Sequence, residues 1–191
     1  MFEFGCCFYF LTFLFKAEYT FTVREFFDYC LGVSMARLDV DSSARIHQSE
    51  IAPGVEIREF CTIRDSSVER DCRIYERVSI KKSSVGIGSD INAGTYIEYA
   101  DIGRGVQIAP NCVIVGVTHN YSREGIGGED VFHRIGIKDG VWVCVGSIIL
   151  PGVVVGEGSV IGAGSVVKVD VPDRHLYVGT PSEYKIRPIK Q

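Results

Sequence analysis

The residue best suited to acid–base chemistry is His119, in the run Thr118-His119-Asn120. An imidazole titrates near neutral pH, so it can take a proton from a hydroxyl or an amine and pass it to a leaving group. Such a base would let a weak nucleophile attack a thioester without a covalent enzyme intermediate. A lone histidine is more often structural than catalytic, so the position of His119 in the fold decides its role.

The other chemistry-bearing residues are less informative. His47, His133 and His175 are interpreted as surface residues, and no two histidines have HxxxxH spacing. The seven cysteines include no CxxC pair, which argues against a zinc ribbon or a disulfide framework and predicts no metal site. Free cysteines favour a reducing cytoplasm.

The elements that must position His119 follow a period of six residues, unlike the 3.6 of a helix or the 2 of a strand. The period is cleanest towards the C-terminus, where aliphatic residues stand six apart: Ile137, Val143, Ile149, Val155, Ile161 and Val167. The same frame continues upstream with single-residue slips, as in Ile57, Ile63 and then Val68. Cys61, Cys72 and Cys112 occupy a recurrent position where a small side chain points inward.

This pattern predicts an all-β solenoid. Each hexapeptide sends one bulky and one small side chain inward and then turns a corner, three such segments form a triangular coil, and stacked coils bury each other's apolar faces. We expect the solenoid over residues 46–172, with about six coils of about eighteen residues. The frame breaks once, and we expect a loop at about 116–135 to leave the coil, with His119 near its start. Long loops on regular scaffolds are usually functional.

The flanking segments have a different character. Residues 1–45 are predicted to form an apolar, partly helical cap, because Thr22-Val-Arg-Glu25 fits a capping box. The apolar run 2–15 is too short to span a bilayer, which leaves peripheral membrane contact as a minor alternative. Residues 173–191 are expected to form a C-terminal tail. The net charge of −4 comes from interleaved signs, so nucleic acid is not expected as a partner.

Several runs resemble the hexapeptide-repeat acyltransferases with a left-handed parallel β-helix, closest to the sugar and polysaccharide O-acetyltransferases. The resemblance rests on residues 102–111, on Thr118-His119-Asn120, on Val141-Trp142 and on the runs 149–152, 161–167 and 178–181. It covers about residues 100–187. Cys144 departs from the pattern, because the family usually carries glycine there.

The resemblance implies a left-handed solenoid, a homotrimer with active sites between subunits, acetyl-CoA as co-substrate and a sugar-type acceptor. It implies that His119 is the catalytic base, that Asn92 hydrogen-bonds the hydroxyls of the acceptor, and that small residues leave room for the pantetheine arm. The residues assigned in this way are Asn92, Asn111 and Trp142 for the acceptor, and Gly146, Ala163, Gly164, Lys168, Lys185 and Arg187 for coenzyme A. Asn92 and Asn111 are equally interpretable as corner residues. Among Glu124, Glu129 and Asp130, none is singled out as the partner that orients His119.

The leading hypothesis is therefore an acetyl-CoA-dependent O-acetyltransferase acting on a hydroxyl of a sugar or polysaccharide precursor. The alternatives are an N-acetyltransferase acting on a nucleotide-linked amino sugar and a xenobiotic acetyltransferase. A γ-class carbonic anhydrase, which needs three histidines on zinc, and a non-catalytic scaffold are least favoured.

Overall fold

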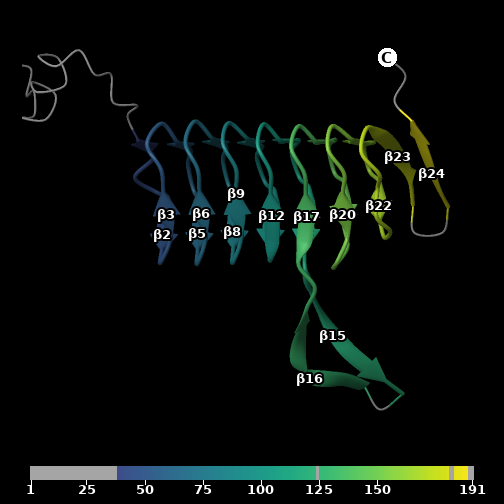
Figure 1. Ribbon diagram of the computed structural model, residues 1–191. Coiled ribbons are helices and arrows are strands. Elements are labelled where there is room, and N and C mark those ends of the chain that lie inside the picture. Colours follow the sequence, from purple (N-terminus) through teal and green to yellow (C-terminus); the bar gives the residue numbers. More distant parts are fainter. Residues whose placement is uncertain (1–37, 124, 181–182, 189–191) are drawn as a thin grey trace, which may run out of the picture. The chain divides into compact units, whose positions relative to one another are not determined.

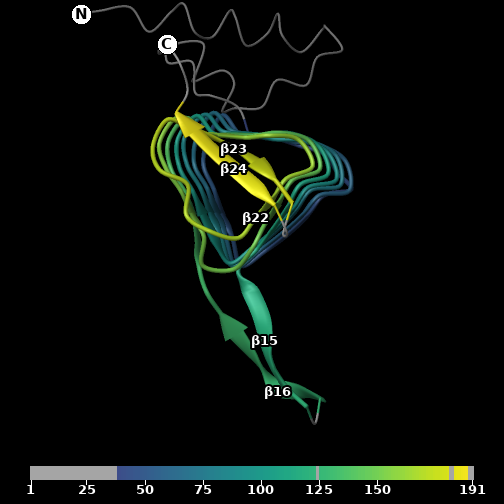
Figure 2. The same cartoon turned by 90° about the vertical axis from the view of Figure 1, so that its right-hand side faces the viewer.

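Short β-strands make up all the regular structure in the residues described by the computed structural model, namely 38–123, 125–180 and 183–188. Three parallel sheets form the faces of a triangular solenoid, as Figures 1 and 2 show. The all-β hexapeptide solenoid predicted from the sequence is confirmed. The predicted helical cap and the apolar run 2–15 lie outside the described residues. Within the described part of the chain, no helix has the length and apolar character needed to cross a bilayer.

Successive coils contribute one strand to each sheet. Sheet A has nine strands: β1 (Asp39–Val40), β4 (Glu56–Ile57), β7 (Arg73–Ile74), β10 (Asp90–Ile91), β13 (Gln107–Ile108), β18 (Trp142–Val143), β21 (Val160–Ile161), β23 (His175–Gly179) and β24 (Tyr184–Pro188). Sheet B has seven: β2 (Arg45–His47), β5 (Thr62–Arg64), β8 (Ser79–Lys81), β11 (Tyr96–Glu98), β14 (Val113–Val115), β19 (Ile148–Ile149) and β22 (Val166–Val167). Sheet C has six: β3 (Glu50–Ile51), β6 (Ser67–Val68), β9 (Ser84–Val85), β12 (Ala100–Ile102), β17 (Ile135–Ile137) and β20 (Val154–Val155).

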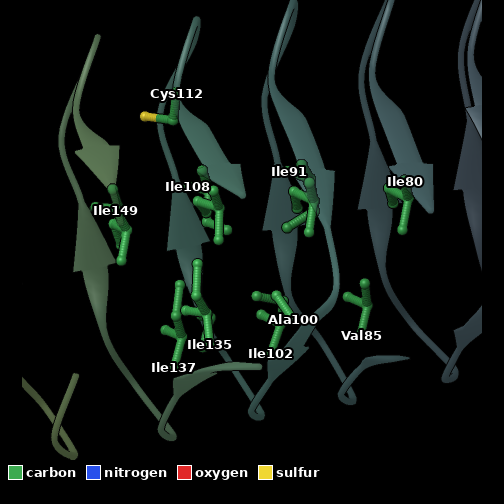
Figure 3. Packing of buried hydrophobic residues seen from close by; sticks show 14 of the residues in the cluster. Ile80, Val85, Ile91, Ala100, Ile102, Ile108, Cys112, Ile135, Ile137 and Ile149 are labelled. Carbon is green, nitrogen blue, oxygen red and sulfur yellow. The ribbon is translucent and has the colours of Figure 1, made fainter. Parts of the chain in front are cut away.

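The core is a stack of aliphatic side chains from all three sheets (Figure 3). The regular aliphatic residues identified from the sequence are all buried, and Ile108 lies between Ile91 and Val143 in register along sheet A. Cys61, Cys72 and Cys112 are also buried, which confirms their predicted inward position. Each coil therefore covers the apolar face of the next one.

The solenoid extends beyond the predicted range at both ends. The first strand in the described part of the chain is β1, which begins seven residues before the expected start at residue 46 and pairs with β4. Its half-buried Val40 packs on the core. At the other end, β23 joins sheet A, and the fully buried Tyr177 donates a hydrogen bond to the Val166 carbonyl at 2.8 Å. Part of the predicted tail therefore closes the core.

The slips in the six-residue frame have a structural cause at the corner between sheets B and C, here called corner BC. Consecutive coils before the hairpin are 17 residues apart there, because a single left-handed residue makes the turn. These residues have φ between 46° and 58°: Gln48, Asp65, Lys82 and Tyr99. Buried serines provide hydrogen bonds to backbone groups of the tight corner, since Ser83 Oγ donates to the Lys81 carbonyl and accepts from the Ala100 amide.

The predicted loop is a two-stranded antiparallel hairpin, β15 (Val117–Ser122) and β16 (Gly125–Phe132). It leaves the solenoid at corner BC, between β14 and β17, and projects away from the triangular coils (Figure 2). Gly116 stands at its base, where an added Cβ would lie 2.5 Å from the Tyr99 carbonyl oxygen and 2.6 Å from that of His133. A glycine is therefore required where the chain leaves the coil.

Candidate active site

His119 lies on β15, directly across the hairpin from Asp130 on β16. Its Nδ1 is 3.4 Å from Oδ1 of Asp130, and the two side chains are exposed to similar extents, 53% and 54%. A carboxylate beside Nδ1 favours a hydrogen on that nitrogen and leaves the Nε2 lone pair available as a proton acceptor. The pair has the arrangement of a base and its orienting group.

Asp130 was not distinguishable from its acidic neighbours in the sequence. The missing information was the secondary structure of the loop, because a hairpin register places position 119 opposite position 130. The register of the hairpin shifts between His119 and Tyr121. Counting residue pairs from the turn at a constant register would therefore not have placed Asp130 opposite His119. Glu129 lies in the same strand, and Glu124 lies outside the described residues.

Trp142 lies on the outer face of sheet A, not on the hairpin. Its side chain is 52% exposed, and it stands in register between Gln107 on β13 and Val160 on β21. The next strands continue this face with Leu176 on β23 and Arg187 on β24. Trp142 is thus an exposed aromatic on a face with apolar neighbours towards the C-terminus.

The small residues assigned to coenzyme A lie at the corner between sheets A and B, here called corner AB. Gly146 and Gly164 have φ of 67° and 65°, and neither has an atom within 4 Å of an added Cβ. Ala163 is exposed beside them. The surface beside these two glycines is open, and Val145 is an exposed apolar side chain at the same corner.

Asn92 and Asn111 also belong to corner AB. Asn111 has φ of 59°, and a Cβ added to Gly94 would lie only 2.5 Å from the Oδ1 atom of Asn111. Asn92 is half-buried and donates its side-chain amide to the Ile108 carbonyl at 2.9 Å. The left-handed conformation expected of a corner residue is present at Asn111 and absent at Asn92, whose side chain instead hydrogen-bonds to the next coil.

The three cations assigned to coenzyme A are not clustered. Lys185 and Arg187 are exposed on β24 at the edge of sheet A, opposite Val178 and Leu176. Lys168 follows β22 in sheet B, at the side of the prism where corner BC lies. One chain therefore groups Trp142, the small residues and two cations around sheet A and corner AB. His119 is at a different corner, with sheet B between the two groups.

A groove of about 560 Å³ runs along corner BC beside the base of the hairpin. It is bordered by the left-handed corner residues and by Arg134: Gln48, Glu50, Asp65, Ser66, Ser67, Lys82, Ser83, Ser84, Tyr99 and Arg134. The sequence alone did not identify it, although the residues after each slip mark its position. Its volume is in the range of small-molecule sites.

Cys144, the departure from the family pattern, is half-buried at corner AB, next to Trp142 and Gly146 in sequence. Its amide donates to the Ile161 carbonyl, and its carbonyl accepts a hydrogen bond from the Cys112 thiol at 3.2 Å. Burial raises the pKa of the Cys144 thiol. The corner geometry is therefore maintained with cysteine in place of glycine. Among the described residues, no three His, Cys, Asp or Glu side chains gather as metal ligands.

Comparison with known proteins agrees with this architecture. Residues 134–168 match the bacterial transferase hexapeptide family (six repeats). Bifunctional protein GlmU of Shouchella clausii is 33% identical over 137 residues, which cover 71% of this chain and 28% of the relative. The chain thus spans less than a third of the length of that curated relative.

Two solved structures have a similar fold. AntD, an N-acyltransferase from Bacillus cereus, is 18% identical with a TM-score of 0.52, and the match covers 86% of this chain and 88% of AntD. A maltose O-acetyltransferase from Clostridium difficile 630 is 23% identical with a TM-score of 0.50, covering 95% and 83% of the two chains. Residues 134–168 thus carry the sequence repeats of the bacterial transferase hexapeptide family, on a chain whose fold is a left-handed parallel β-helix.

Proposed function

We propose that the protein transfers the acetyl group of acetyl-CoA to a hydroxyl of a sugar or polysaccharide precursor, with His119 as general base. The observation that carries the proposal is the His119–Asp130 pair on the hairpin that interrupts a hexapeptide-repeat solenoid. A putative acetyltransferase of Schizosaccharomyces pombe is among the chain's relatives, and the structural neighbours include a maltose O-acetyltransferase and an N-acyltransferase.

The chemistry follows from one proton acceptor. Nε2 of His119 takes the proton of the acceptor hydroxyl while its oxygen attacks the thioester carbonyl. The carbon–sulfur bond then breaks, the acetyl group remains on the acceptor oxygen, and the imidazolium gives its proton to the departing thiolate. Asp130 orients the ring and stabilises the imidazolium between these two steps.

The surface around corner AB fits the pantetheine arm of coenzyme A. Gly146, Ala163 and Gly164 leave the corner open, so an extended chain can lie against the coils. Lys185 and Arg187, on the adjacent edge of sheet A, supply cations for its phosphates. Neighbouring structures hold this class of ligand, as AntD was crystallised with 3-hydroxybutyryl-CoA. Acetyl-CoA also suits a protein of the cytoplasm, where we place the reaction.

A complete site requires a second copy of the chain. His119 and the proposed coenzyme A surface lie on either side of sheet B in one chain. The hairpin projects away from its own coils, and its Tyr121 and Ile126 side chains are 87% and 77% exposed. We therefore place the hairpin of one copy over corner AB of the next in a homotrimer.

The groove at corner BC is the proposed binding place of the acceptor. It adjoins the hairpin and offers polar groups suited to a hydroxyl-rich ligand, including Gln48, Asp65 and Ser67. An Asp65→Asn variant should raise the KM of the acceptor and leave the KM of acetyl-CoA unchanged. A KM that does not change would place the acceptor elsewhere.

A substrate screen tests the proposed function. Release of the CoA thiol would be followed with free sugars, nucleotide sugars, nucleotide-linked amino sugars and chloramphenicol-type drugs, and mass spectrometry would locate the acetyl group. Acetylation of a sugar hydroxyl is the expected result. Acetylation of an amine alone would favour the N-acetyltransferase alternative, and turnover with none of the panel would contradict the proposal.

A further inference from the structure

The hairpin is held to the solenoid by a group of five side chains at its base, here called the root cluster: Lys82, Tyr99, Asp101, Phe132 and Arg134. Its members come from corner BC, from β12 and from the end of the hairpin itself. Outside this cluster, the hairpin strands pair mainly with each other. A lone two-stranded hairpin is only marginally stable in water, so its direction depends on how its base is fixed.

Arg134 makes the central contacts of the root cluster. Its Nη1 donates to Oδ1 of Asp101 at 2.6 Å, and its Nη2 donates to the Lys82 carbonyl at 3.2 Å. Asp101 is held in turn by Ser84, whose hydroxyl donates to the same Oδ1 at 2.7 Å. The planar guanidinium thus joins sheet C to corner BC through two differently directed hydrogen bonds.

The aromatic rings extend this cluster to the hairpin. The guanidinium carbon of Arg134 lies 4.4 Å from the ring centroid of Tyr99, and that ring lies 5.1 Å from Phe132 at an angle of 57°. Lys82 Nζ is 5.0 Å from the Phe132 centroid. Cations over aromatic faces and tilted ring pairs are both favourable arrangements.

Phe132 connects the root cluster to the catalytic pair. It is the last residue of β16 and pairs with Val117, two residues before His119 on β15. Backbone bonds fix the same point, because the His133 amide donates to the Gly116 carbonyl at 2.8 Å. A rotation of Phe132 would therefore move both strands that carry His119 and Asp130.

We propose that Arg134 is a positioning residue, which sets the direction of the hairpin through Tyr99 and Phe132 and thereby the place of His119 in the site. The inference rests on the proposed function for its kinetic consequences. Its structural consequence, a hairpin held in one direction, is measurable without any activity.

The structural test is hydrogen exchange of the whole protein with Arg134→Ala. We expect faster exchange in residues 117–132, with unchanged exchange in residues 84–108 of the preceding coils. Arg104→Ala is the matched control, since Arg104 is exposed and its hydrogen bonds are made by the backbone: its amide donates to Oδ1 of Asp139, and its carbonyl accepts from the Gly140 amide. Unchanged exchange in the hairpin, or an equal increase in the coils, would overturn the proposal.

The kinetic test separates positioning from folding, and kcat is measured at saturating acceptor because Arg134 also borders the groove at corner BC. With an acceptor found in the substrate screen, Arg134→Ala should lower kcat by roughly 10- to 100-fold, as misplaced catalytic groups do, and leave the KM of acetyl-CoA unchanged. Arg134→Lys, which keeps the cation but not the forked hydrogen bonds, should lose less. In a His119→Ala background the Arg134 substitution should have no further effect on kcat, because the two residues act as one unit. If the two substitutions lower kcat independently, so that their losses multiply in the double variant, the proposal is overturned. If His119→Ala alone causes no loss of kcat, the proposed function is contradicted. The exchange test then decides the role of Arg134.

Discussion

His119 and Asp130 face each other across the hairpin, with Nδ1 and Oδ1 3.4 Å apart. Both side chains are about half exposed, so solvent weakens their attraction. The arrangement differs from a buried catalytic dyad, in which the orienting carboxylate is shielded from water.

Asp130→Asn should lower kcat by roughly 1.4- to five-fold in the exposed arrangement, because exposed pairs contribute about 0.2–1 kcal/mol. The measurement is steady-state kinetics at several salt concentrations, with Glu129→Gln as the matched control. Higher salt should reduce kcat of the native protein more than that of Asp130→Asn. A loss equal to that of His119→Ala would show that the pair is shielded in the working oligomer.

Cys144 reports on the proposed coenzyme A surface. Burial raises the pKa of its thiol, so the neutral form predominates at pH 7 and the reactive thiolate appears only as the pH rises. Alkylation by iodoacetamide should therefore be slow at pH 7 and accelerate up to and beyond pH 9. The tryptic peptide 139–168 contains Cys144 as its one cysteine, so mass spectrometry follows this site alone.

Acetyl-CoA, whose sulfur is acylated and so cannot consume iodoacetamide as the free thiol of coenzyme A would, should slow the alkylation of Cys144 in a saturable way, whereas adenosine alone should have little effect. This result requires no acceptor and no turnover. An alkylation rate that is indifferent to acetyl-CoA would place the pantetheine arm away from corner AB.

Ser83→Ala tests the serine hydrogen bonds of corner BC. Ser83 is buried, and its hydroxyl both accepts from the Ala100 amide at 3.0 Å and donates to the Lys81 carbonyl at 2.6 Å. Losing it leaves a buried amide without a partner, at a cost of about 1–3 kcal/mol. Thermal unfolding should show a lower Tm for Ser83→Ala and little change for Ser79→Ala, whose hydroxyl is on the half-exposed face of β8. Equal Tm values would contradict the structural role.

Mixed oligomers test whether each site is shared between copies. His119→Ala removes the base, and Ala163→Trp places a bulky side chain on the coenzyme A surface. If the site is shared, random mixing of the two inactive variants should restore about a quarter of native activity, because a quarter of the junctions combine an intact hairpin with an intact surface. If each site lies within one chain, the mixture stays as inactive as its parts.

The sequence predicted the repeating core because the aliphatic residues from Ile137 to Val167 obey one period, and burial of such residues is what holds stacked coils together. It did not predict the geometry of corner BC. At this corner a non-glycine residue such as Asp65 or Lys82 adopts a left-handed conformation, which the residue type does not predict.

Site prediction had a similar limit. His119 was recognisable from the break in the repeat, but Asp130 and Arg134 act through cross-strand and cross-coil contacts that have no fixed spacing along the chain. In the proposed trimer, the relation between His119 and corner AB depends on how copies associate, which is a property of surfaces and not of the local pattern. Trp142 was visible as the one tryptophan, and only the fold shows that it faces outward from sheet A.

The most direct test of the account is the turnover of His119→Ala with acetyl-CoA and the acceptor found in the screen. Removal of a general base should lower kcat by about 10²–10⁴-fold. Coenzyme A affinity, measured by calorimetry, should stay at the native value, and the His47→Ala control should retain native kcat. Native turnover by His119→Ala would contradict the account at its centre.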